Sequence, residues 1–339
     1  MDRDWIKISF IYVGTVIGAG FASGREIVEF FGIYGLKGIL GLSVAGVLFS
    51  LMGSLLLLKI YRNKIKGFDD LVARMFGKKF GIVLDIIMII SLYTGYSVMI
   101  SGSGAIFKEE LGASFTLGII TMVILSFIVF LFQLEGFSFI SSALVPLLIL
   151  GIVFTSLYLI IKGDHNLYGI NEGNIITHKG NFFSSSLLYV GSNSLIIITV
   201  FSSLLPLIRN RKTAILGGVA GGIILYMLGL SILLIMLLHY PEIKTMDIPM
   251  LKISNYIGRS YRKFYAIILW IAIFTTAIAN GSSFINRFAN SRYKLPIATI
   301  FCISAIPLAH LGFAKLVSLI YPIFGFIGLI ILVFILMVL

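Results

Sequence analysis

Charged residues are scarce in this sequence, which excludes most classes of soluble protein. Asp, Glu, Lys and Arg make up 12% of the 339 residues, whereas 59% are hydrophobic. A typical soluble domain is about 25% charged and about 45–50% apolar. At about 20 residues per crossing, the apolar residues suffice for up to about ten membrane helices. The composition excludes a soluble enzyme, a disordered tail and a nucleic-acid-binding module, and it predicts a protein embedded in a lipid bilayer.

Cysteine is nearly absent as well. The single Cys302 can form no internal disulfide and lies inside an apolar run, so it gives no indication of redox chemistry. The first five residues contain two acids and no small-residue cleavage site before the first long apolar run. We therefore expect that run to remain as a helix rather than to be removed as a signal peptide.

Patterns typical of enzymes and ATP-driven pumps are missing too. The string Gly18-x-Gly20-xxx-Gly24 resembles a dinucleotide-binding loop, but no strand or βαβ unit surrounds it. Neither a Ser–His pair nor two aspartates occur at mid-span. The four histidines fall in loops or at the ends of apolar runs: His165, His178, His239 and His310. We do not expect an enzyme.

Ten apolar runs are bounded by charges or turn residues, and each is long enough to cross a bilayer with some tilt. They fall at about 6–32, 36–60, 80–107, 114–133, 136–162, 182–208, 213–239, 261–288, 294–311 and 313–338. Most Lys and Arg lie in loops that face the cytoplasm if the N-terminus is inside, which predicts both termini inside. The net charge of +12 therefore comes from basic loop residues that orient the helices in the membrane. We expect an amphipathic helix over 62–79 on the inner surface, an outer loop over 163–181 and a short outer helix within 240–260.

Two spans contain residues that weaken a helix near mid-membrane. The first reads GTVIGAGFASG over 14–24, and the sixth reads YVGSNS over 189–194. Glycine costs about 1 kcal/mol in a helix interior, and Asn and Ser compete for backbone hydrogen bonds. We expect both helices to be discontinuous, which is tolerated only against protein or a wet cavity. The alternative for the glycines is close helix packing, as in the small-residue pair Gly14 and Gly18.

The two interruptions lie about half the chain apart, with five spans in each half. An odd number of spans inverts the second half relative to the first. The pattern predicts an all-α polytopic membrane protein of ten transmembrane helices, with a first inverted repeat over 1–162 and a second over 182–339. Interrupted helices at matching positions of two such repeats mark the binding site of a transporter.

Ionisable residues inside an apolar span are expensive and usually functional. Arg25, Glu26 and Glu29 occupy the end of the first span and are predicted to form a gate at the outer mouth. The alternative is an i,i+4 ion pair between Arg25 and Glu29 that reaches water.

On the eighth span, Thr275 and Thr276 can direct two hydroxyl oxygens to one point, one turn after the carbonyl of Ala272. Together with loosened carbonyls of the first span, they would form a neutral oxygen cage suited to Na⁺. The alternative is that the hydroxyls bond to their own helix.

On the third span, Tyr93 and Ser97 share a face, with Tyr96 beside them. A buried tyrosine hydroxyl needs a partner, which would be either a substrate carboxylate or a neighbouring carbonyl.

The string from Gly14 to Glu26, followed by Phe30 and Phe31, resembles the first-helix signature of the YkvI-like bacterial membrane proteins. We associate that family with the amino acid–polyamine–cation superfamily. The resemblance implies a LeuT-type 5+5 fold with spans one and six unwound around the substrate. It implies a Na⁺ site made by the carbonyls of Gly14, Ile17 and Ala272 and the hydroxyls of Thr275 and Thr276. The implied substrate contacts, with Ser97 added from the third-span face, are Gly18, Ala19, Gly20, Tyr93, Tyr96, Ser97, Gly191, Ser192, Asn193, Ser194 and Asn280.

Two departures from relatives bear on these expectations. Some proton-coupled relatives place a lysine of span five at the position of the cation. Span five of this chain has no lysine within the membrane, which favours Na⁺ as the coupling ion. The chain stops at span ten, so a dimer interface formed by an eleventh and twelfth helix is not expected, and the oligomeric state is left open, a monomer included.

The leading hypothesis is a Na⁺-coupled symporter of an amino acid or similar small zwitterionic solute in the bacterial cell membrane. Proton coupling is an alternative. Another alternative is a ligand sensor that keeps the fold and transports nothing, as in germinant receptor subunits. The identity of the solute and the direction of transport are left open.

Overall fold

The structure is a computed structural model. It describes residues 4–132, 137–162, 180–285, 287 and 294–338, and within these it leaves out the side chains of 75–80, 132, 137–144 and 294. The described part of the chain is helical and contains no strand. The helices are α1 (Asp4–Val16), α2 (Ala19–Ala22), α3 (Arg25–Phe30), α4 (Lys37–Asn63), α5 (Phe68–Leu111), α6 (Phe115–Phe132), α7 (Phe137–Lys162), α8 (Phe182–Ser202), α9 (Arg211–Leu238), α10 (Tyr240–Ile243), α11 (Pro249–Ser254), α12 (Arg259–Ile285), α13 (Lys294–Ala309) and α14 (Phe313–Val338), with 3₁₀ turns η1 (Gly32–Tyr34) and η4 (Leu205–Leu207).

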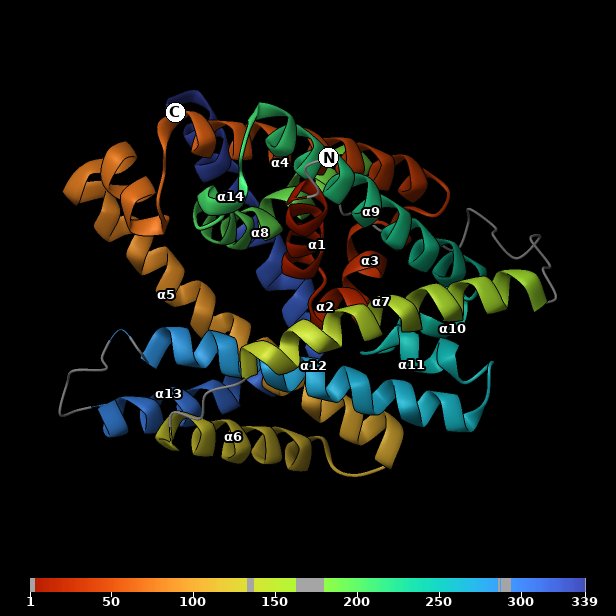
Figure 1. The fold of residues 1–339 in the computed structure, drawn as a ribbon. Helices are drawn as coiled ribbons and strands as arrows, with labels where there is room; N and C mark the ends of the chain where they lie inside the picture. The colour runs from red at the N-terminus through yellow and green to blue at the C-terminus, as the bar shows by residue number, and fades with distance from the viewer. Residues whose placement is uncertain (1–3, 133–136, 163–179, 286, 288–293, 339) are drawn as a thin grey trace.

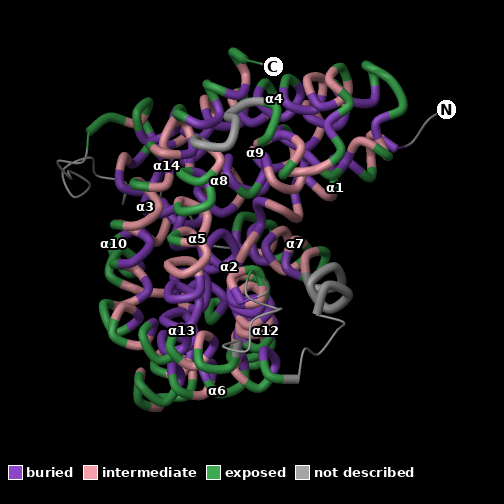
Figure 2. The backbone as a smooth tube through the Cα atoms, turned by 90° about the vertical axis from the view of Figure 1, so that its left-hand side faces the viewer, coloured by how far each residue is buried: buried purple, intermediate pink, exposed green. Residues whose placement is uncertain are grey.

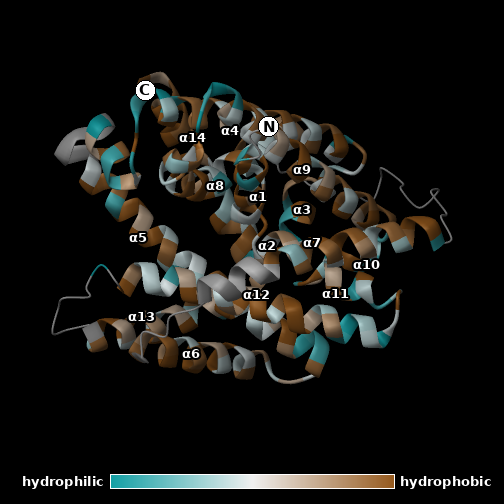
Figure 3. Cartoon of the chain, viewed as in Figure 1, coloured by the Kyte–Doolittle hydropathy of each residue, from teal (hydrophilic) through white to brown (hydrophobic). Residues whose placement is uncertain are grey.

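The composition and hydropathy of the helices confirm a membrane protein. Seven of the described helices are long and apolar enough to cross a bilayer, and two shorter helices, Phe115–Leu131 and Leu295–Ala309, are also apolar. Figure 3 shows hydrophobic residues along most of each long helix. Large apolar side chains such as Phe10, Ile300 and Met337 are exposed on the outside, which is stable where the surrounding solvent is lipid.

The helices form two layers with the short helices α2 and α3 between them (Figures 1 and 2). In the first layer α4 packs against α9 and α8, α1 packs against α9, and α14 packs against α8. Helix α5 runs from the first layer, where it contacts α14 and α8, into the second layer, where it packs against α12, α6 and α13 (Figure 1). Helix α7 joins the layers because it contacts both α12 and α9.

The first span is interrupted as predicted. Helix α1 ends at Val16, and the amide of Gly18 donates to the carbonyl of Val16 at 2.9 Å instead of reaching one turn back. A second interruption follows at Gly24, whose φ of 78° is readily adopted only by glycine. The hydroxyl of Tyr265 on α12 donates to the carbonyl of Ala22 at 2.7 Å, which fixes α2 between the two layers.

The predicted interruption of the sixth span is wrong, because α8 is continuous from Phe182 to Ser202. A Cβ atom on Gly191 would collide with the backbone of Gly325 in α14, so this glycine serves close helix packing. The polar side chains that follow bond to their own helix. Ser194 donates to the carbonyl of Gly191 at 2.7 Å, and Asn193 donates to the carbonyl of Tyr189 at 3.0 Å. They therefore leave the helical ladder intact.

Several boundaries differ from the sequence prediction. Helix α5 begins at Phe68, so the expected surface helix continues directly into the third span. Helix α8 ends before the turn η4, where Pro206 lacks an amide for helical bonding. The predicted break between the last two spans is confirmed, with Gly312 at a φ of 96°. Within 240–260 the expected short helix is present as α11, whereas the expected outer loop over 163–181 lies, except for its last two residues, outside the described residues.

Candidate functional site

A cavity of about 180 Å³ lies at the interruption of the first span. From that span it is lined by Thr15, Val16, Gly18, Ala19 and Gly20. An engineered cavity of about 150 Å³ holds benzene, so this volume accommodates a small organic solute. The predicted substrate contacts of the first span therefore lie together at one cavity.

The second layer supplies one polar wall. Thr276 and Asn280 of α12 line the cavity together with Ser91, Thr94 and Gly95 of α5. The amide nitrogen of Asn280 would lie 2.8 Å from a Cβ atom on Gly95, so glycine leaves room for this side chain.

The first layer supplies the opposite wall. Ser192 and Asn193 of α8 line the cavity, as do Tyr321 and Phe324 of α14. The predicted residues Gly191 and Ser194 do not line it. They face α14, where Gly328 packs against both of them.

The tyrosine prediction on the third span is not supported. The hydroxyl of Tyr96 bonds to the hydroxyl of Ser126 on α6 at 2.7 Å and lies 3.6 Å from the sulfur of Cys302 on α13. Ser97 donates to the carbonyl of Tyr93 at 2.9 Å, and the Tyr93 ring packs edge-on against Phe301. The two tyrosines thus contact α6 and α13, the Ser97 hydroxyl bonds within α5, and none of the three lines the cavity.

Glu26 lies in the cavity rather than with the rest of the predicted gate. The residue is 5% exposed. A Cβ atom on Gly20 would collide with the Glu26 carboxylate, so the glycine opens the space that this group occupies. The Tyr321 hydroxyl, which also lines the cavity, lies beside the carboxylate.

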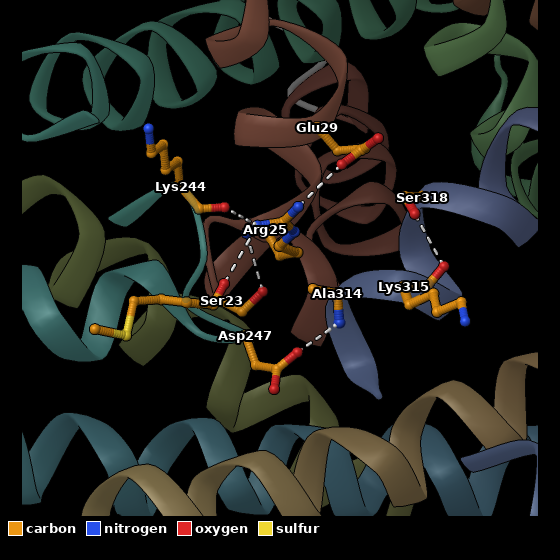
Figure 4. A network of polar contacts seen from close by, with 9 residues as sticks. Ser23, Arg25, Glu29, Lys244, Asp247, Ala314, Lys315 and Ser318 are labelled. Carbon is orange, nitrogen blue, oxygen red and sulfur yellow. Dashed lines mark hydrogen bonds and ion pairs between the residues drawn. The ribbon is translucent and has the colours of Figure 1, made fainter. Parts of the chain in front are cut away.

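Arg25 and Glu29 turn away from the cavity and form the i,i+4 ion pair weighed as the alternative (Figure 4). The pair is buried instead of reaching water. Arg25 also donates to the carbonyl oxygens of Lys244 and Met246 at 3.1 and 3.2 Å. The three residues of the predicted gate are thus divided between two environments, and the gating role itself stays a prediction.

The segment 244–250 is tied to three other parts of the chain. Its Asp247 accepts a hydrogen bond from the amide of Ala314 at the start of α14, at 2.8 Å. The amide of Asp247 donates to the Glu109 carboxylate at the end of α5, at 3.0 Å. The amide of Met250 donates to the carbonyl of Ser23 at 3.0 Å. The 244–250 segment therefore closes one end of the region around α3.

The residues of the predicted Na⁺ site lie on α1 and α12 and in the interruption between α1 and α2. The carbonyl of Ala272 accepts hydrogen bonds from both Thr275, at 3.0 Å, and Thr276, at 2.8 Å. Thr276 lines the cavity, whereas Thr275 is buried outside it. Gly14 faces Val145 of α7. Both threonine hydroxyls thus bond to their own helix, as the alternative interpretation predicts. The Na⁺ site stays a prediction.

Sequence reasoning missed two parts of the lining. On α5 the cavity face is formed by Ser91, Thr94 and Gly95, about one helix position from the predicted Tyr93 face. On α14 it missed Tyr321, whose hydroxyl in an otherwise apolar span is the signal that could have identified it.

Comparisons with known proteins agree with the sequence resemblance. The chain is 31% identical over 329 residues to the membrane protein YkvI of Bacillus subtilis (strain 168), which covers 95% of this chain and 92% of YkvI. It is 25% identical over 339 residues to the protein YyaD of the same organism, which covers 98% of this chain and 96% of YyaD. No family model matches the chain.

The fold is similar to that of solved transporters. Two mutant forms of the manganese transporter of Eremococcus coleocola superimpose with TM-scores of 0.57 and 0.59. Both matches cover 97% of this chain, and they cover 77% and 78% of the transporter chains. The sequence identities are 15% and 16%, so the likeness is one of fold.

Proposed function

The chain belongs to the YkvI family of membrane proteins, and on this premise we propose that it is a secondary active transporter. Its solute is a small zwitterion such as an amino acid, and the N-terminus faces the cytoplasm. The similarity in fold to solved transporters supports the general class.

The observation that carries the proposal is the polar cavity at the interrupted first span. It lies between the two layers of helices and combines a carboxyl group, hydroxyl and amide groups, and two aromatic rings. A few placed polar groups in an otherwise apolar enclosure are typical of sites for small organic molecules. Among the described residues, His, Cys, Asp and Glu form no group of three that could hold a metal ion.

Alternating access would follow from rocking of the first layer against the second, with ten membrane crossings in two inverted repeats over 1–162 and 182–339. Helix pairs separated by five positions in the predicted order of spans, α4 with α9 and α5 with α12, are in close contact. This pairing is expected when two five-helix repeats interlock. Because α8 is continuous, its contribution to the site comes from the side chains of Ser192 and Asn193.

For the coupling ion we retain Na⁺, with H⁺ as the alternative. The chemistry of the donor set supports Na⁺, which prefers oxygen ligands: the Ala272 carbonyl and the hydroxyls of Thr275 and Thr276 are held together by the hydrogen bonds between them. The Gly18 amide bonds to Val16, so the carbonyl ladder of α1 is interrupted near Gly14 and Ile17. A bound Na⁺ would supply positive charge beside this end of α1.

Uptake into proteoliposomes tests the proposal. The purified chain is reconstituted and offered radiolabelled amino acids under an inward Na⁺ gradient, an inward H⁺ gradient, or choline without either gradient. We expect accumulation of at least one solute only with a cation gradient. Uptake that no gradient changes would contradict coupled transport. Specific binding without counterflow exchange would instead identify a sensor on this fold.

A further inference from the structure

The cavity is lined by one carboxyl group, that of Glu26, and by no basic side chain among the described residues. We propose that the Glu26 carboxylate pairs with a protonated amino group of the solute, which makes the cavity a site for small organic amines, amino acids included. This inference rests on the proposed function for its assumption that the cavity holds a solute. It goes further by naming the chemical group that the solute must carry.

Glu26 is the residue of α3 that lines the cavity. It belongs to α3, whose side chains are otherwise packed among neighbours, yet its carboxylate reaches back to the interruption at Gly20. Any larger residue at Gly20 would displace it. Removing a carboxylate from water is costly unless a partner compensates its charge.

The described cavity walls place neutral polar groups near Glu26 but no cationic side chain. The Tyr321 hydroxyl is a neutral donor. The adjacent cation, Arg25, directs its guanidinium to Glu29 and to two backbone carbonyls. A cationic group that enters the cavity would therefore meet a carboxyl group that forms no ion pair with any described residue.

Other oxygens of the cavity suit the same group. An ammonium group carries three donors. Besides the Glu26 carboxylate, the walls offer the hydroxyl oxygens of Ser192 and Tyr321 and the side-chain amide oxygen of Asn193 as acceptors.

The rest of the cavity fits the remainder of an amino acid. The rings of Tyr321 and Phe324 line the same wall, and aromatic faces attract organic cations. The amide of Asn193 on that wall, and the amide of Asn280 and the hydroxyl of Thr276 on the opposite wall, are neutral groups. They offer hydrogen bonds to a carboxylate or amide at the far end of the solute.

Binding to the purified full-length chain in detergent tests the inference without any gradient. The probes are three compounds on each of several carbon skeletons: an amino acid, its amide, and the carboxylic acid that lacks the amino group. Glycine, alanine and leucine provide the skeletons. We expect the compounds with an amino group to bind in titration calorimetry and to raise the thermal midpoint. The deaminated acids should do neither.

Variants separate the carboxylate from the fold. Glu26→Gln should bind the amines about 30-fold more weakly or worse, as expected when one partner of a buried charge pair is removed. Glu26→Asp, which keeps the charge on a shorter side chain, should lie between the two. Glu242→Gln, the same change at an exposed carboxylate on α10, is the matched control and should bind as the unmodified chain does.

Three results would overturn the inference: no amine binds the unmodified chain, a deaminated acid binds as tightly as its amine, or a folded Glu26→Gln protein keeps its affinity. A Glu26→Gln protein that keeps amine affinity but loses pH-dependent uptake would assign Glu26 to a proton instead. Amine binding without coupled uptake leaves the inference standing while the transporter proposal fails, so the two failures are distinguishable.

Discussion

Arg25 and Glu29 face each other across one turn of α3, with 3.0 Å between the guanidinium and the carboxylate, and both side chains are buried. Removing one partner of such a pair leaves an uncompensated charge, at a cost of about 3–5 kcal/mol. We predict that Arg25→Met lowers the thermal midpoint in detergent strongly. The double variant Arg25→Met with Glu29→Leu should be more stable than either single variant. A double variant less stable than both would show that the pair itself is strongly net stabilising.

Two glycines provide an internal comparison of packing with unwinding. A Cβ atom on Gly191 would strike the backbone of α14, whereas a Cβ atom on Gly18 meets nothing within 4 Å. Gly191→Ala should therefore destabilise the protein by about 1–3 kcal/mol through overpacking. Gly18→Ala should keep its stability while placing a methyl group beside the cavity. Equal thermal midpoints for the two variants would contradict this assignment of Gly191 to packing.

Thr276 is the member of the predicted ion site that also lines the cavity. Thr276→Ala is expected to raise the Na⁺ concentration needed for half-maximal uptake and to leave folding intact. Thr299→Ala on α13 is the matched control, because that exposed hydroxyl bonds to its own helix at 3.0 Å. If both variants respond alike to Na⁺, the hydroxyl of Thr276 has no role in ion coupling.

A pH-dependent contact lies outside the membrane spans. The Tyr256 hydroxyl donates to Glu242 at 2.6 Å, and this hydrogen bond holds the pKa of Glu242 below its ordinary value. A carboxyl with a lowered pKa stabilises the fold above its unfolded pKa of about 4.3, and the contribution is lost as pH falls through the folded value. Tyr256→Phe should therefore lower the thermal midpoint slightly near neutral pH. Because both residues are largely exposed, the difference should be small and should vanish in acid; a difference that grows in acid would contradict this.

The sequence predicted the first interruption because several glycines with polar neighbours follow one another within eleven residues. It could not distinguish interruption from packing at Gly191, because the distinction depends on Gly325 and Gly328. These residues are distant in sequence, and their contact with Gly191 is visible only in three dimensions.

The third-span tyrosines show a different limit. One residue turns a helix by about 100°, so periodicity alone could not decide whether Tyr93 or Thr94 faces the cavity. Glu26 was recognised as functional from its cost in an apolar span, but its separation from Arg25 and Glu29 depends on the same rotation. Arg25 and Glu29 lie one turn apart on one face of α3, whereas Glu26 lies on another face.

Arg25 holds the 244–250 segment through main-chain oxygens of Lys244 and Met246, so the side chains at those positions are free to change without breaking the bonds. Lys244 is exposed, and the chain's sole cysteine, Cys302, is buried. A thiol-reactive fluorophore attached through Lys244→Cys would consequently label one site without prior cysteine removal. Its emission would report, in real time, any rearrangement of the 244–250 segment.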